Sequence, residues 1–335
     1  MSNNHSEADK IDAGNFLQNI LWTGLREGIQ ASWSIIKIMV PISFGVALIK
    51  YFGIVNELSR VLSPLCCFLG LRGEAILALI SGYLINCYSA IAVMATLALS
   101  AKEVTILATM LLLCHTLPIE MGVQKKAGGA FGVILLTRLF SSLMAGFVLN
   151  LIIPGNTGFT NIQPVGNTAV PSESFIQAIF SCLKENTVIF KIIVINISIA
   201  VFYRLLKRYR ILEKLSNGFK PVMLILGLPK DMVFLWSVTN VLGLIYGASL
   251  LIEAKKNNNL AEVDLKRLNL SLATCHALVQ ETANFLAIGA SLPFLLIPRI
   301  VIAISSVWLY NLRLYLKGVN LRLRANAGNP GITPE

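Results

Sequence analysis

Charged residues and histidine are scarce in this sequence. Asp, Glu, Lys and Arg make up 13% of the 335 residues, and three residues are His. Soluble domains carry about 25% charged residues, whereas 55% of this chain is hydrophobic. This composition excludes an ordinary soluble domain and indicates a polytopic membrane protein. The net charge of +11 comes from Lys and Arg between apolar segments, where it sets membrane orientation, so we expect no nucleic-acid partner.

Signatures of catalysis and secretion are also missing. The sequence has no P-loop, no HExxH motif and no GxSxG in a convincing context, so we expect neither an enzyme nor a bound cofactor. The six Cys lie in or beside apolar stretches, unlike the spaced Cys of a disulfide framework. Residues 1–20 hold no continuous apolar run, and we therefore expect no cleaved signal peptide.

Long apolar stretches are abundant, and a stretch needs about 20 residues to cross a bilayer. Six reach that length: 33–54, 74–99, 129–153, 187–205, 231–251 and 286–310. Two shorter runs, 104–117 and 268–278, meet charge or proline before they reach it, which favours re-entrant segments. Segments 55–69 and 208–226 are apolar on one helical face and charged on the other, which predicts amphipathic helices in the membrane interface.

The two short runs carry one motif twice. CHTLPIE begins at Cys114 and CHALVQE begins at Cys275, so both spell Cys-His-x-Leu-x-x-Glu. Seven of 25 aligned positions are identical without a gap, where composition predicts about two, and we infer an internal duplication. The identical pairs are Cys114/Cys275, His115/His276, Leu117/Leu278, Glu120/Glu281, Gly128/Gly289, Leu135/Leu296 and Arg138/Arg299.

A segment rich in Gly, Pro, Asn and Thr divides the chain into halves. It contains no Lys or Arg, whereas residues 204–220 and the C-terminal tail are basic, so we expect the divider outside and both termini in the cytoplasm. The predicted organisation is an N-terminal cytoplasmic segment 1–27, a first repeat 28–153, an external linker 154–172, a second repeat 173–312 and a cytoplasmic tail 313–335.

Each repeat then makes an odd number of crossings, and the two repeats have inverted topology, a plan common in secondary transporters. This arrangement puts the basic loop at 255–267 outside, against the positive-inside rule.

The duplicated motifs are the predicted binding site. Re-entrant segments that enter from opposite faces meet near the midplane, where irregular backbone needs protein or a wet cavity around it. His115, Glu120, His276 and Glu281 would bind a small polar solute or a coupling proton or cation. Further candidates for solute contact are Gln124, Gln280, Asn86 and Asn240.

A helix break must turn His115 and Glu120 toward one ligand, because residues five apart diverge by about 140° on a helix. We assign the first break to Pro118, whereas the second copy has Val279 there and needs tertiary contacts.

Two other interpretations of the motif stay open. In the first, Glu120 and Glu281 neutralise Arg138 and Arg299 as structural ion pairs, and the histidines cap the segments. In the second, the motif Cys, His and Glu residues hold a soft or borderline metal ion. Adjacent residues diverge by about 100° on a helix, which argues against Cys and His of one copy sharing an ion. The Cys candidates for metal are Cys114 and Cys275.

Three strings resemble a known family: GLRGEAILALISGYLINCYSAIAVM, ILATMLLLCHTLPIEM and LSLATCHALVQETANFLAIGASL. They look like the nucleoside-recognition Gate domain of concentrative nucleoside transporters, of the membrane part of FeoB iron transporters, and of spore maturation proteins A and B. The whole chain resembles a fused pair of the last two. The resemblance implies an all-α polytopic protein of the bacterial inner (plasma) membrane, with two inverted-topology Gate repeats, about six full spans and two re-entrant segments.

The resemblance also implies a function. It favours a transporter of a small polar, nucleoside-like solute. It leaves open a divalent metal (iron-like) permease and a non-transport membrane assembly or signalling protein of the spore-maturation type. The expected partners are the lipid bilayer, the solute, a coupling proton or cation, and a second copy or another membrane protein.

Overall fold

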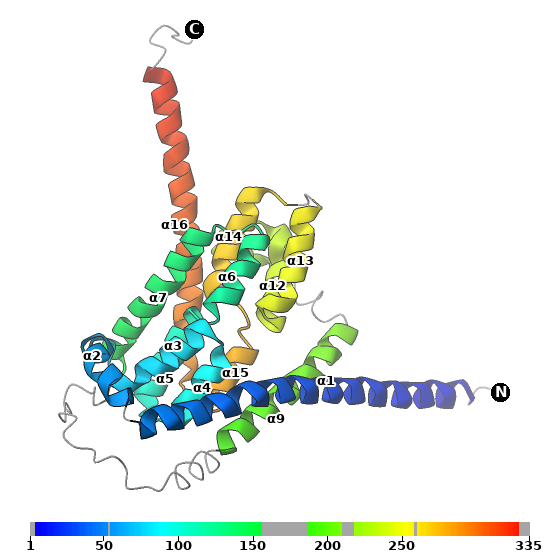
Figure 1. Cartoon of the computed structure of the whole chain (residues 1–335). Helices are drawn as coiled ribbons and strands as arrows, with labels where there is room; N and C mark the ends of the chain where they lie inside the picture. The colour runs from blue at the N-terminus through cyan, green and yellow to red at the C-terminus, as the bar shows by residue number, and fades with distance from the viewer. Residues whose placement is uncertain (1–3, 53, 156–185, 210–217, 258–259, 328–335) are drawn as a thin grey trace, which may run out of the picture.

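The computed structural model describes residues 4–52, 54–155, 186–209, 218–257 and 260–327. Every regular element in these ranges is a helix (Figure 1). This confirms the all-α polytopic class expected from composition. The linker from 156 onward, the start of the second repeat and residues 210–217 of the second amphipathic segment lie outside the described residues.

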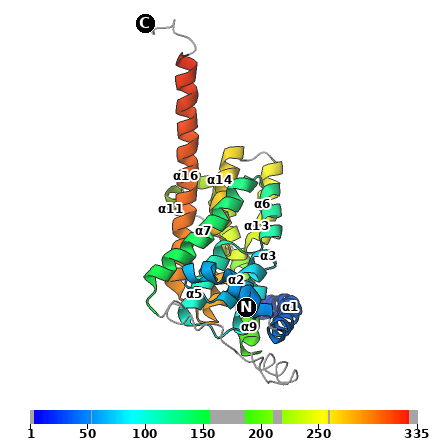
Figure 2. The ribbon, with the colours of Figure 1, turned by 60° about the vertical axis from the view of Figure 1, so that its left-hand side comes forward.

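Four single helices are long and apolar enough to cross a membrane. They are α1 (Asn4–Tyr51), α7 (Phe131–Ile152), α9 (Asn186–Arg208) and α16 (Leu292–Ala327). α1 and α9 pack against each other, and α16 projects well beyond the helical body (Figure 2). The predicted boundaries at 27/28 and 312/313 fall inside α1 and α16, and the domain limits stay a prediction.

The stretch 74–99 does not form one crossing helix. It divides into α3 (Ile76–Leu84) and α4 (Cys87–Ala95), which pack against each other as a hairpin. A Cβ on Gly82 of α3 would lie 2.9 Å from Ala90 Cβ of α4, so glycine permits the close approach. Residues eight apart on one straight helix would be about 12 Å apart. The hairpin corrects the prediction of a single span.

The second half contains the same device in place of the predicted span 231–251. α12 (Val233–Leu242) and α13 (Leu244–Lys256) are separated by Gly243, whose φ of 86° needs the left-handed region. Gly247 of α13 packs directly on Thr239 of α12. Both halves therefore contain a short helical hairpin.

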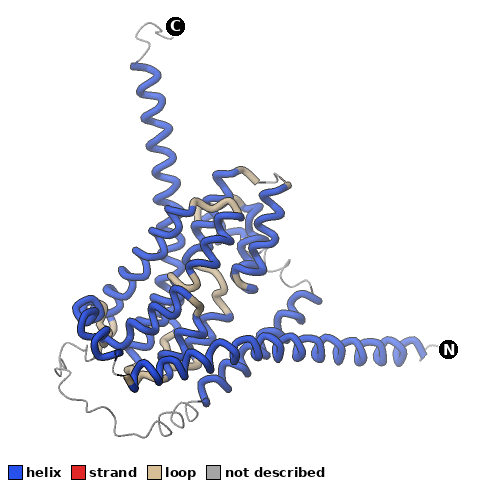
Figure 3. The backbone as a smooth tube through the Cα atoms, viewed as in Figure 1, coloured by secondary structure: helices blue, strands red, loops and turns tan. Residues whose placement is uncertain are grey.

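The first motif run is part of a longer broken helix. In the first half, α5 (Ala101–Leu113) and α6 (Leu117–Lys126) together are long enough to cross a membrane. In the second half, α14 (Glu262–Thr274) and α15 (Gln280–Leu286) have the same order of helix, break and helix, but they are not among the described helices that are long and apolar enough to cross a membrane. Non-helical backbone accordingly lies inside the helical body as well as at its ends (Figure 3). The first motif segment is therefore a candidate crossing, and the re-entrant role of the second motif segment stays a prediction.

One contact decides which ends of these helices share a face. The Lys255 ammonium donates to the carbonyl oxygen of Lys126 at 3.3 Å. The sequence-based topology put Lys126 inside and Lys255 outside, and that separation is wrong. If 231–256 is a hairpin that returns to its side of entry, both lysines lie on one face, as the positive-inside rule favours.

The turns that precede the hairpins are also alike. The predicted amphipathic segment 55–69 is a helix, α2 (Ile54–Phe68), and α11 (Lys220–Ile225) is its described counterpart. Gly70 ends the first turn with φ of 70° and Gly227 ends the second with φ of 68°, a left-handed cap that favours glycine. Short 3-10 turns, η1 (Gly73–Ala75) and η2 (Lys230–Met232), then lead into the hairpins.

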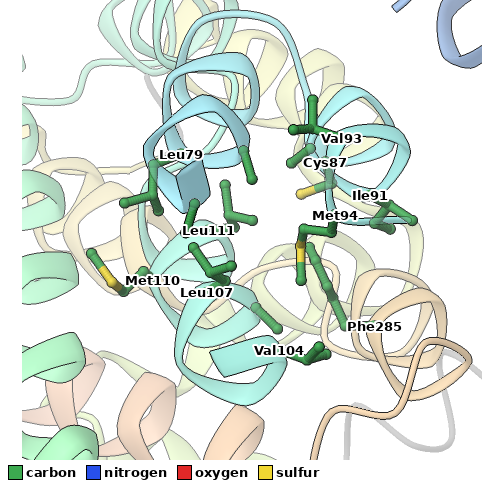
Figure 4. Packing of buried hydrophobic residues seen from close by; sticks show 14 of the residues in the cluster. Leu79, Cys87, Ile91, Val93, Met94, Val104, Leu107, Met110, Leu111 and Phe285 are labelled. Carbon is green, nitrogen blue, oxygen red and sulfur yellow. The ribbon is translucent and has the colours of Figure 1, made fainter. Parts of the chain in front are cut away.

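The largest apolar core surrounds the first hairpin. It joins α3, α4 and α5 and includes Phe285 from α15, which packs beside Met94 (Figure 4). A second core joins α11, α12, α14 and α16. The two motif breaks lie between these cores.

Candidate functional site

Two buried arginines stabilise the helix breaks by donating hydrogen bonds to their backbone carbonyls. A helix that stops inside a protein leaves carbonyl groups without helical partners. Arg138 of α7 donates to the carbonyls on either side of Cys114, at 3.2 and 2.8 Å. Arg299 of α16 donates in the same way to the carbonyls on either side of Cys275. Both guanidinium side chains are fully buried, so each break has an arginine as a structural element.

The hairpins complete each break. Thr116 and Ala277 follow the two histidines with φ of 49° and 48°, a left-handed conformation that side chains rarely adopt. The amide of Thr116 donates to Gly82 O at 2.9 Å, and the amide of Ala277 donates to Thr239 O at 3.3 Å. Each break therefore rests on backbone from the hairpin of its own half.

Pro118 does not cause the first break. α6 begins at Leu117, so Pro118 lies in the first helical turn, where its missing N–H costs no hydrogen bond. The second copy breaks at the same position with Val279 in place of proline. The arginine and hairpin contacts, which both copies share, explain both breaks.

The histidines are oriented by the ends of their own helices. His115 Nδ1 lies 2.9 Å from Leu111 O, and His276 Nδ1 lies 2.7 Å from Leu272 O. Because a carbonyl oxygen only accepts, Nδ1 carries the hydrogen in each ring. The interaction caps the helix end and directs Nε2 of both rings to the interior.

Four motif side chains from the two halves meet there. His115 Nε2 lies 3.0 Å from Glu120 Oε1 and 2.9 Å from Glu281 Oε1. His276 Nε2 lies 3.3 Å from Glu120 Oε1 and 4.0 Å from Glu281 Oε1. The two imidazole rings are 5.1 Å apart between centroids. We call these four residues the His–Glu cluster.

The arginines pair unequally with the carboxylates. Arg138 Nη1 lies 2.5 Å from Glu120 Oε2, a tight buried ion pair. Arg299 Nη2 lies 3.6 Å from Glu281 Oε2, and its Nη1 is 3.5 Å from the hydroxyl of Thr282. The Glu281 side chain is also more exposed, at 17% against 8% for Glu120. The geometry thus supports the structural ion pair for Arg138 and a looser one for Arg299.

If both imidazole rings are neutral, the cluster lacks a hydrogen or a cation between its nitrogen and oxygen atoms. With Nδ1 protonated, a neutral imidazole offers a lone pair at Nε2. That lone pair would face carboxylate oxygens at 2.9–3.3 Å, acceptor against acceptor. A shared proton or a bound cation between Nε2 and the carboxylates removes the conflict. Cation or proton binding is therefore the chemistry that this arrangement can perform.

Two groups of donor atoms are close enough together for a metal ion. One comprises His115, Glu120 and His276, and the other comprises Cys87, His115 and Glu281. A ring whose Nδ1 bonds to a backbone carbonyl has the orientation common in metal-ligating histidines. Within the described residues Cys114 and Cys275 belong to neither group, so the sulfur that approaches the cluster is that of Cys87.

A polar network adjoins the cluster on one side. Gln280 Nε2 donates to the Tyr88 hydroxyl at 3.1 Å and to Asn196 Oδ1 at 2.9 Å. Tyr88 also donates to Asn196 Oδ1, whose amide nitrogen donates to Asn284 Oδ1 at 3.2 Å. We call these four residues the amide network, and three helices, α4, α9 and α15, contribute to it.

Three predicted solute contacts have other surroundings. Gln124 is fully buried one turn after Glu120, and neither of its amide atoms has a hydrogen-bond partner in the described structure. Asn86 caps α4 through Ser89. Asn240 donates to the carbonyl of Trp236 and approaches the sulfur of Cys275 at 3.9 Å.

Sequence reasoning missed two members of the site. Cys87 was not among the candidate ligands, although it directly follows the polar Asn86 at a hairpin tip. Asn196 was not singled out, although it is a buried amide in the apolar run of α9. A polar residue inside an apolar, membrane-spanning stretch indicates a functional site, and this signal pointed to Asn196.

Comparisons with known proteins give one family. The family model described as Gate, nucleoside recognition, matches residues 32–131. The uncharacterized membrane protein YvoD of Bacillus subtilis (strain 168) is 30% identical over 289 residues, which cover 86% of this chain and 93% of that protein. No solved structure matches the chain.

Proposed function

Because this chain belongs to the Gate, or nucleoside recognition, family of membrane proteins, we propose that it is a transporter that binds a small polar solute at the His–Glu cluster. The observation that carries the proposal is that Glu120 from one half contacts both histidines, at 3.0 and 3.3 Å. Secondary transporters built from repeats bind their substrates between the repeats, at broken helices. A buried cluster of ionisable groups is costly in a bilayer and is a functional site by default.

The topology that supports this role has three crossings in each half. They are α1, α5–α6 and α7 in the first half, and α9, α14–α15 and α16 in the second. The hairpins α3–α4 and α12–α13 enter from opposite faces and return. With both termini in the cytoplasm of a bacterial inner (plasma) membrane, Lys126 and Lys255 both lie inside, as does the basic tail. The proposed topology keeps the inverted repeat and gives the re-entrant role to the hairpins.

The amide network suits an uncharged, hydrogen-bonding part of the solute. Gln280, Asn196 and Asn284 offer both donors and acceptors, and Tyr88 adds a hydroxyl. Sites for small molecules combine apolar walls with a few such groups. A nucleoside-like solute has polar groups of this kind. A proton or cation in the cluster would couple its movement to an ion gradient.

A divalent metal ion is the second candidate cargo. His115, Glu120 and His276 present their ligand atoms within 4.8 Å of one another, which is the observation that favours it. Imidazole and carboxylate ligands suit first-row metals such as iron or zinc. Under this alternative Cys87 contributes to binding, and a chelator abolishes the effect.

A thermal-shift screen of detergent-purified protein tests the proposal. The panel contains nucleosides, nucleobases, amino acids, organic acids and divalent metals, each with wild type and with His115→Ala/His276→Ala. A ligand at 100 times its Kd stabilises the fold by about 2.7 kcal/mol. We expect a nucleoside-like compound to raise Tm in wild type and to lose its effect in the double variant. Cys114→Ala/Cys275→Ala is the matched control, because these residues adjoin the cluster in sequence without contributing ligand atoms to it.

Other outcomes separate the alternatives. A shift caused by metal alone, lost in Cys87→Ala, would favour the permease. A compound that still stabilises the His115→Ala/His276→Ala variant would contradict the site. No shift with any compound, together with a membrane partner retained on gentle solubilisation, would favour an assembly or signalling role.

A further inference from the structure

A groove lies between α7 and α16, away from the His–Glu cluster. Its volume is about 480 Å³, and Leu270 of α14 contributes to its lining. Leu136 and Phe140 of α7 and Leu309 of α16 line it with exposed side chains, at 69%, 66% and 64% exposure. The two helices that form its walls are both candidates for crossing the membrane (Figures 1 and 2). The groove therefore opens toward lipid.

The walls of the groove are antiparallel. The start of α5 contacts the end of α7 through Lys102, which donates to Asn150 O at 2.9 Å. It also contacts the start of α16, where the Ser291 amide donates to Thr105 Oγ1 at 3.2 Å. The end of α7 and the start of α16 thus share one face. The opposite end of the groove, with Arg313, is on the face of the basic tail.

The groove has the length of one acyl chain in one leaflet. On α7 it extends from Val133 to Met144, and on α16 from Ile302 to Arg313. Eleven residues of helix rise about 16 Å, close to half of the roughly 30 Å hydrocarbon core. The groove accordingly covers the half of the core that is nearest to Arg313.

Two serines in the lining are hydrogen-bonded to their own helices. Ser141 Oγ donates to the Arg138 carbonyl at 3.1 Å, and Ser306 Oγ donates to the Ala303 carbonyl at 3.0 Å. These small side chains leave room between the helices, while their hydroxyls are satisfied by their own backbones. The surface that remains suits hydrocarbon.

Charge is concentrated at one end. Arg313 lines the groove there and is exposed, and it pairs with no carboxylate in the part of the chain that the structure describes. Tyr310 lies one turn earlier in the same lining, a residue typical of the headgroup level. A cation at the mouth of an apolar groove complements a phosphate with a chain attached.

We propose that this groove binds one anionic phospholipid, with an acyl chain between α7 and α16 and the headgroup phosphate on Arg313. The lipid separates the two helices that carry Arg138 and Arg299, the arginines that hold both motif breaks. By fixing the distance between these helices, the lipid helps to position the arginines that contact the motif breaks beside the His–Glu cluster. This inference does not depend on transport.

Native mass spectrometry of delipidated protein tests the site. Phosphatidylglycerol and phosphatidylcholine with identical acyl chains are offered in equal amounts. One Arg near an anionic lipid is worth about a fivefold preference, so we expect wild type to retain one phosphatidylglycerol with that preference. Arg313→Gln should bind both lipids equally, and Arg313→Lys should keep the preference. Lys317→Gln is the matched control, because Lys317 is exposed one turn later and does not line the groove.

A second variant tests the hydrocarbon part. Ser306→Phe fills the groove, and we expect it to lose the bound lipid of either class while the protein remains monodisperse with a normal Tm. If that variant does not fold, the Arg313 series still decides. Equal binding of both lipids by wild type, or a preference that persists in Arg313→Gln, overturns the proposal. A change from dimer to monomer in Ser306→Phe with unchanged lipid binding would identify a second copy as the occupant.

Discussion

Replacing Arg138 by Met should destabilise the protein more than the same change at Arg299. Met has a similar length and no charge, so the substitution removes the guanidinium while keeping most of the volume. It leaves the buried Glu120 carboxylate without the guanidinium nitrogen that lies 2.5 Å from it. It also removes the donor of two backbone carbonyls. The same change at Arg299 removes a longer ion pair, because Arg299 lies 3.6 Å from Glu281. The Glu281 side chain is already more exposed than that of Glu120, and it stays 2.9 Å from His115.

The size of the difference follows from these contacts. Removing one partner of a buried ion pair costs about 3–5 kcal/mol. At Arg299 the ion pair is long, and losing its backbone hydrogen bonds costs about 1–3 kcal/mol. At roughly 2 °C per kcal/mol, the lower end for large domains, we expect Tm to fall by about 6–10 °C for Arg138→Met and by about 2–6 °C for Arg299→Met.

Thermal unfolding in detergent, followed by tryptophan fluorescence, measures both variants. The double variant Arg138→Met/Glu120→Gln adds a thermodynamic cycle. Contacting residues show interaction energies of about 0.5–3 kcal/mol, so the double variant should lose less than the sum of its singles. Equal effects at the two arginines, or strict additivity with Glu120→Gln, would refute the assignment of a tight buried pair to the first half.

Three further predictions concern other parts of the molecule. Gly247→Ala should destabilise by about 1–3 kcal/mol, because a methyl group there meets Thr239 across the second hairpin, whereas Gly122→Ala, with no atom within 4 Å, should be neutral or stabilising in thermal melts. A cysteine at Lys255 should react with an impermeant maleimide from the cytoplasmic side alone, and labelling from outside would contradict the re-entrant hairpin. Asn196→Leu should remove the solute-induced rise in Tm and lower the free energy of unfolding by about 1–3 kcal/mol, because Gln280 and Tyr88 both lose the Asn196 oxygen to which they donate; a full ligand response in this variant would exclude the amide network from binding.

Composition and hydropathy predicted the class of fold but not which segment folds back. A window of apolar residues has the same mean hydropathy whether the chain crosses once or returns. The local signals for the returns were Asn86 and Gly243 at the tips, an N-cap residue and a glycine with positive φ. The conflict of the 255–267 loop with the positive-inside rule pointed to the same correction.

The candidate site was predictable as far as the motif was duplicated. Identity between the halves selected both His–Glu pairs and both arginines, because duplicated polar residues in apolar segments need a shared reason. The ligand geometry of Cys87 and the amide network was not predictable, because these side chains come from helices distant in sequence. Their approach depends on how α4 and α9 pack against α15.

The two halves share the motif residues at the helix breaks and differ at positions that flank the breaks. Outside the shared motif residues the copies differ: Gln280 and Asn284 align with the apolar Ile119 and Val123, and the core residue Phe285 aligns with Gln124. The arginines, histidines and left-handed residues are matched, because the geometry of the break demands them. Had the motifs served only to hold the fold, the polar positions beside them would have no reason to differ between the copies. The proposed central site, common to both halves and with the solute held beside the amide network, accounts for both the likeness and the difference.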